Sequence, residues 1–115
     1  MKPTIEIDEM NFESEVLRSS QPVLVEFATS WSVPSMMMNG TMDEIGAELR
    51  DHLKVARVKL DDSPNLGLWY GIQCLPTILY FSGGEVRVGI CGTTSKEAIL
   101  SQLKAVMKYP CGSFV

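Results

Sequence analysis

Residues 29–36 are the segment best placed to do chemistry, because they join a predicted buried strand to the start of a predicted helix. The first N–H groups of a helix lack intrahelical partners and carry partial positive charge, so they stabilise an anion. A cysteine there would become a reactive thiolate, with a pKa below about 8.5. The sequence instead has Ser32 and Ser35, whose hydroxyls form neither a thiolate nor a mixed disulfide at neutral pH. Ser32 precedes Pro34, a pattern that predicts a helix N-cap.

Glu26 is a second candidate, a carboxyl group inside the apolar run of residues 22–28. Burial removes water from a carboxylate and disfavours its charged form. We therefore expect the pKa of Glu26 to lie above its ordinary value of about 4.3. Such a group either transfers protons in a reaction or is a structural acid paired with a base, and the residues alone leave both interpretations open.

Three cysteines, Cys74, Cys91 and Cys111, supply the only thiols of the sequence. An odd and small number argues against a disulfide scaffold. Cys74 and Cys91 are interpreted either as small hydrophobic side chains or as surrogate, redox-sensitive thiols. Cys111 falls in the terminal segment, where we expect no specific role. A single histidine, with cysteines and methionines scattered along the chain, predicts no metal site, and no motif indicates a cofactor.

The elements that position these residues follow from the spacing of apolar side chains. Strands are predicted at residues 4–7, 22–28, 54–61, 76–82 and 85–91, and helices at residues 11–19, 34–51, 63–70 and 94–108. Gly83 and Gly84 predict a hairpin turn, and Thr94 the N-cap of the last helix. Helices placed between strands predict an α/β fold, a three-layer α/β/α sandwich with a mixed sheet. We expect one domain over residues 1–108 and a tail over residues 109–115.

Residues 27–35, read as Phe-Ala-Thr-Ser-Trp-Ser-Val-Pro-Ser, resemble the active-site segment of thioredoxins, where Trp-Cys-Gly-Pro-Cys is the usual pattern. Leu75 and Pro76 resemble the family segment whose proline is cis. Gly84 and Gly92 fall where thioredoxins have their hairpin and a groove-lining glycine. The resemblance extends over residues 5–106, and it implies the thioredoxin fold with a five-stranded sheet and four helices.

The resemblance also implies a role for each site residue. Ser32 and Ser35 would occupy the positions of the two redox cysteines, and Glu26 with Arg57 those of a buried acid and its basic partner. A groove for an extended polypeptide would be lined by Trp31, Val33, Pro34, Leu75, Pro76 and Gly92. Trp31 has packing in the core as its alternative. The implied partners are protein substrates and, for a form that carries the dithiol, a thioredoxin reductase.

Three explanations of the two serines remain open. The chain is an engineered Cys-to-Ser form of an active thioredoxin, a naturally redox-silent binding module, or a relative of the monothiol subgroup with the pattern Trp-Cys-x-Pro-Ser. Ala28, Met36 and Gly40 depart from the usual tryptophan, lysine and helix-bending proline, which favours the second explanation. In each case thiol–disulfide exchange is the ancestral reaction, and we expect this chain to be redox-inactive at residues 32 and 35. Its status as an enzyme stays open.

The composition excludes several other classes of function. The chain has 115 residues, a net charge of −4 and no basic cluster, so the electrostatic footprint of a nucleic-acid binder is absent. Its longest apolar runs are far shorter than the ~20 residues that span a bilayer. The first residues alternate charged and apolar side chains without the apolar core of a signal peptide. We therefore expect a cytoplasmic protein with no membrane partner.

Overall fold

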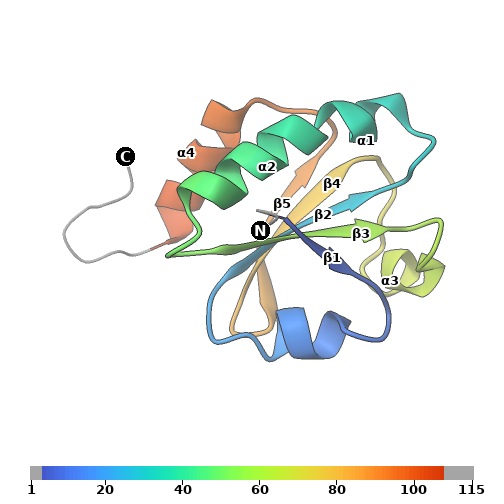
Figure 1. Cartoon of the computed structure of the whole chain (residues 1–115), viewed down its shortest axis with the longest axis horizontal. Helices are drawn as coiled ribbons and strands as arrows, with labels where there is room; N and C mark the ends of the chain where they lie inside the picture. The colour runs from blue at the N-terminus through green and yellow to red at the C-terminus, as the bar shows by residue number, and fades with distance from the viewer. Residues whose placement is uncertain (1–3, 108–115) are drawn as a thin grey trace.

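Five strands form one mixed sheet in residues 4–107, the part of the chain that the computed structural model describes (Figure 1). The strands are β1 (Ile5–Ile7), β2 (Val23–Ala28), β3 (Lys54–Lys59), β4 (Thr77–Ser82) and β5 (Glu85–Cys91). Their order across the sheet is β1-β3-β2-β4-β5. β1, β3 and β2 are parallel, whereas β4 runs antiparallel to both β2 and β5. The predicted tail, with Cys111, lies outside the described residues.

Helices cover both faces of this sheet. On one face lie α2 (Asn39–Glu48) and α4 (Lys96–Val106), with α1 (Val33–Met37) leading into α2 (Figure 1). The π-helical turn η1 (Glu13–Leu17) and α3 (Pro64–Trp69) lie on the other face. All four predicted helical segments are therefore helical, and the predicted α/β class with a mixed five-stranded sheet is confirmed. No helix within residues 4–107 is long and apolar enough to cross a membrane.

The central strand β2 explains how the layers pack. All six of its residues are buried, as its continuous apolar run predicts for a strand covered on both faces. Because successive side chains point to opposite faces, Leu24 packs with α2 and α4, while Val25 and Phe27 pack with η1 and α3. Glu26 points the same way as Leu24, and it enters the core on the face that α2 covers.

The helices end within a few residues of the predicted bounds, and two of their features differ from the predictions in kind. The helix predicted at residues 34–51 is divided at Met38, where the N–H of Met38 donates to the carbonyl of Ser35, three residues back, at 3.2 Å. This tighter turn separates α1 from α2 two residues before Gly40. The last helix is capped by Ser95 and not by Thr94, because the Ser95 hydroxyl accepts the N–H of Ala98 at 3.1 Å.

Candidate functional site

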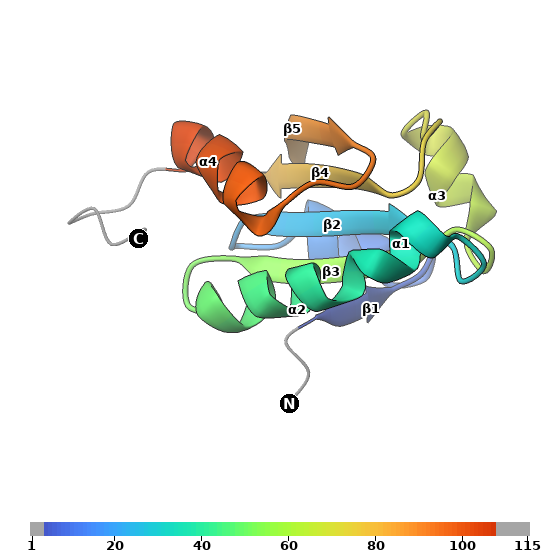
Figure 2. The same cartoon turned by 90° about the horizontal axis from the view of Figure 1, so that it is seen from above.

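Three segments that are distant in the sequence meet where β2 ends. The strand register pairs Phe27 with Thr77 and Thr77 with Cys91. The residues after β2, before β4 and after β5 therefore share one end of the sheet, the end where α1 begins and α3 lies (Figure 2). The Leu75–Pro76 peptide bond is cis, as the resemblance implies. The N–H of Gly92 donates to the carbonyl of Pro76 at 2.8 Å, so the structure brings these two predicted groove residues together.

Large apolar side chains are exposed at this end of the sheet. Trp31 is 71% exposed and Val33 is 63% exposed, and Pro34 is exposed as well. Leu75 is half-buried and Pro76 is buried. The alternative that Trp31 packs in the core is therefore wrong. Exposed apolar side chains grouped in this way are typical of surfaces that bind partners or ligands.

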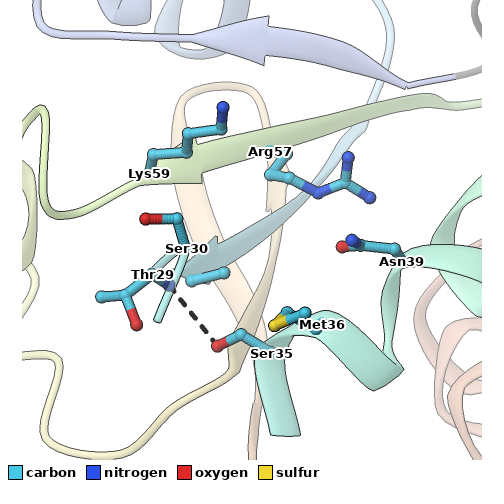
Figure 3. Close-up of a pocket in the computed structure, with 8 residues that line it drawn as sticks. Thr29, Ser30, Ser35, Met36, Asn39, Arg57 and Lys59 are labelled. Atoms are coloured by element: carbon cyan, nitrogen blue, oxygen red, sulfur yellow. Dashed lines mark hydrogen bonds between the residues drawn. The ribbon is translucent and has the colours of Figure 1, made fainter. Parts of the chain in front are cut away.

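Ser32 and Ser35 alternate in sequence with these exposed residues, and both are buried. The Ser32 hydroxyl accepts the N–H of Ser35 at 3.3 Å, and this bond makes Ser32 the N-cap of α1, as predicted. The Ser35 hydroxyl accepts the N–H of Thr29 at 3.5 Å, shown as the dashed line in Figure 3. The two hydroxyls thus bind backbone N–H groups and hold the turn between β2 and α1 together.

Glu26 and Arg57 form a buried ion pair on neighbouring strands. The Arg57 Nε donates to Oε1 of Glu26 at 3.1 Å, and the Glu26 side chain is fully buried. Oε2 of Glu26 has no hydrogen-bond partner among the described residues. Burial raises the pKa of Glu26, and the hydrogen bond and charge of Arg57 offset only part of that effect. The expected direction of the pKa change is confirmed.

The raised pKa of Glu26 predicts a pH-dependent free energy of unfolding. The folded state holds the Glu26 proton more tightly than the unfolded state, so the contribution of this group is fully present below about pH 4.3. It declines as the pH rises from there through the folded-state pKa. Glu26→Gln keeps an acceptor for Arg57 and should abolish this decline. Urea unfolding of both proteins across this range measures the difference, and parallel pH profiles would contradict the assignment.

A cavity of about 220 Å³ opens beside Ser35 on the other side of the β2–α1 turn (Figure 3). Arg57 and Lys59 of β3 supply its cationic wall, and Asn39 and Met36 face them from the helices. We did not predict this cavity. The sequence feature that could have indicated its cationic wall is the alternation of β3, which places Arg57 and Lys59 on the same face of the strand.

Cys74 and Cys91 are joined by a disulfide, with their Cα atoms 6.0 Å apart. The interpretation of these residues as separate small hydrophobic side chains is therefore wrong. Sequence reasoning missed the disulfide because it depends on strand register. Cys91 lies opposite Thr77 in the β4–β5 ladder, and this register brings Cys91 close to Cys74, three residues before Thr77. Among residues 4–107, no group of three or more histidine, cysteine or acidic side chains could hold a metal ion.

Comparison with known proteins agrees with this architecture. The thioredoxin family model matches residues 3–105. The chain is 35% identical over 103 residues to a thioredoxin of Griffithsia pacifica, covering 90% of this chain and 94% of that protein. It is 40% identical over 92 residues to thioredoxin M5, chloroplastic, of Oryza sativa subsp. japonica, covering 80% of this chain and 54% of that protein. A bifunctional thioredoxin reductase/thioredoxin of Mycobacterium leprae is 35% identical over 104 residues, 90% of this chain and 23% of that protein.

The chain belongs to the thioredoxin family, and its fold is the thioredoxin fold. It is a homologue of that family's thiol–disulfide oxidoreductases. Members of the family typically act on protein substrates and are reduced by thioredoxin reductase.

Proposed function

We propose that this chain binds extended polypeptide segments at the groove formed by Trp31, Val33, Pro34, Leu75, Pro76 and Gly92, without thiol chemistry at residues 32 and 35. Ser32 and Ser35 stand at the positions of the two redox cysteines of the family. The proposal is supported by their place at the start of α1, Ser32 as its N-cap and Ser35 in its first turn, and by the neighbouring Trp31 and Pro34. A hydroxyl cannot form a mixed disulfide, so the turn keeps its geometry but not the reaction.

The observation that carries the proposal is the free backbone of Leu75. Within residues 4–107, neither the N–H nor the carbonyl of Leu75 forms a hydrogen bond, because β4 begins only at Thr77. An extended chain can pair with such groups as an added strand does, and apolar pockets beside them select its side chains. The exposed Trp31 and Val33 supply apolar surface at the same end of the sheet.

The partner of this groove is therefore an extended segment of a protein. Thioredoxin reductase would serve only a form of the chain that carries a dithiol at residues 32 and 35. Composition and charge still favour a cytoplasmic location.

A charged residue in the groove should weaken polypeptide binding. Val33→Asp places a carboxylate at an apolar position that a bound chain would cover, so its desolvation should raise the Kd by about tenfold or more. Carboxymethylated insulin B chain, whose thiols are blocked, is a suitable extended probe for titration calorimetry.

Val86→Asp is the matched control, because Val86 is 43% exposed on β5 near the hairpin, at the opposite end of the sheet from Gly92. This variant should bind the B chain as the parent does. Equal Kd values for the parent and Val33→Asp would refute the proposed groove.

A further inference from the structure

The disulfide between Cys74 and Cys91 lies directly beside the proposed groove. Cys74 precedes Leu75 and Pro76, and Cys91 precedes Gly92, so each cysteine adjoins a groove residue in sequence. Neither Cys74 nor Cys91 takes part in the function proposed above.

The pair is open to an incoming thiol. Cys91 ends the edge strand β5 and is exposed, whereas Cys74 is half-buried. Both cysteines line a cavity of about 330 Å³, whose apolar wall includes Tyr70, Ile72 and Leu79. Exchange requires a thiolate to reach one sulfur of the disulfide, and the exposure of Cys91 provides that access.

The segments that carry the two cysteines are also held together by other bonds. Gly92 donates its N–H to Pro76 at 2.8 Å, and Thr77 pairs with Cys91 in the ladder between β4 and β5. Opening of the disulfide therefore leaves these segments in place. The Cα separation of 6.0 Å lies within the range of ordinary disulfides, so the two thiols stay close enough to pair again.

Thr77 favours Cys74 as the sulfur that leaves. Its hydroxyl donates to the Cys74 carbonyl at 2.6 Å and lies 3.4 Å from the Cys74 Sγ. When the disulfide opens, rotation of this hydroxyl lets it turn its one proton from the carbonyl to a Cys74 thiolate and stabilise the thiolate. A more stable thiolate is a better leaving group, so attack at Cys91 is the favoured direction.

We propose that Cys74 and Cys91 form a reversible thiol–disulfide exchange site, separate from residues 32 and 35, that reacts with the thiols of peptides. A partner thiolate attacks the Cys91 Sγ and forms a mixed disulfide, and Cys74 leaves as a thiolate that takes a proton from water. A second partner thiolate then attacks the partner sulfur, and Cys91 leaves as a thiolate that is protonated likewise. Two partner thiols are oxidised to a disulfide as the protein disulfide is reduced by two electrons. The reverse sequence reduces a partner disulfide.

Equilibration of the whole chain against glutathione redox buffers tests reversibility. Cys111→Ser in every sample removes the third thiol, and alkylation with mass spectrometry measures the reduced fraction. We expect the disulfide to be reduced and re-formed reversibly, with Cys74 and Cys91 reduced to the same extent, while the amide NMR spectrum stays that of a folded protein. A disulfide that resists reduction until the chain unfolds would overturn the proposal and leave a structural crosslink.

Single variants test which cysteine carries the mixed disulfide with the partner, because the remaining protein thiolate attacks the disulfide of the added reagent. Cys74→Ser should form a mixed disulfide at Cys91 about tenfold faster than Cys91→Ser forms one at Cys74, because Cys91 is the more exposed of the two residues. Oxidised glutathione and an activated, cysteine-containing B-chain peptide are the two reagents, and the faster of the two adducts identifies the source of the partner thiol. Equal rates for the two variants, or no adduct with either reagent, would overturn the assignment. This test is independent of the groove, because glutathione needs no extended binding surface.

Discussion

Cysteine at both residues 32 and 35 is expected to give the chain a protein-disulfide reductase activity at the turn between β2 and α1. A thiolate at residue 32 would stand at the N-cap of α1, where the N–H of residue 35 already donates to the side chain at 3.3 Å. That donor and the helix N-terminus both lower the pKa of a thiol. Residue 35 is buried, so its thiol would resolve the mixed disulfide from inside the turn.

The rate of insulin reduction should be at least about a hundredfold higher than that of the serine form, because a hydroxyl supplies no thiolate at all. Turbidity from reduction of insulin by dithiothreitol measures it. Cys74→Ser and Cys91→Ser in every sample ensure that the signal comes from the new pair alone. The single variant Ser32→Cys is the matched control and should stop at the mixed disulfide. A double variant that forms its disulfide but reduces insulin no faster than the serine form would contradict our placement of the two positions.

Removal of the cation beside Glu26 is the second change with a large expected effect. Arg57→Met leaves a fully buried carboxyl group without its partner, so the pKa of Glu26 should rise further. At neutral pH the variant should lose about 3–5 kcal/mol of unfolding free energy, the usual cost of breaking a buried pair. The loss should shrink at acidic pH, because protonated Glu26 needs no cation.

Urea unfolding of the parent and of Arg57→Met measures the loss of unfolding free energy at neutral and at acidic pH. The double variant Glu26→Gln/Arg57→Met removes the buried charge together with its partner, and it should recover most of the stability at neutral pH. A loss that is equal at both pH values, or a double variant no more stable than Arg57→Met, would show that packing of the Arg57 side chain and not charge accounts for the effect.

Much of the fold could be predicted because single segments carried unambiguous patterns. The apolar run of β2 indicated a strand buried on both faces, and the alternation of β3 assigned Val55 to one face of the sheet and Val58 to the other. Ser32 was predicted as a cap and Glu26 as a buried acid from their immediate neighbours alone. These features depend on local sequence, which is why this one sequence was enough to predict them.

Sequence reasoning missed two features, one that depends on how strands align and one that depends on a single backbone hydrogen bond. The Cys74–Cys91 disulfide follows from the register that pairs Thr77 with Cys91, and no periodicity in the sequence specifies that register. The break at Met38 also escaped prediction, because the apolar spacing continues across it and only the hydrogen bond to Ser35 reveals the tighter turn.

Amide NMR of the labelled chain during titration with carboxymethylated insulin B chain tests whether an extended polypeptide binds along the groove. A polypeptide bound along the groove should form hydrogen bonds with Leu75 and cover Trp31 and Val33. We expect the amide signals of Leu75, Val33 and Gly92 to shift together and saturably, while the signal of Val86 stays in place. Shifts confined to the cavity lined by Arg57 and Lys59, or no shift at any concentration, would contradict polypeptide binding at this groove.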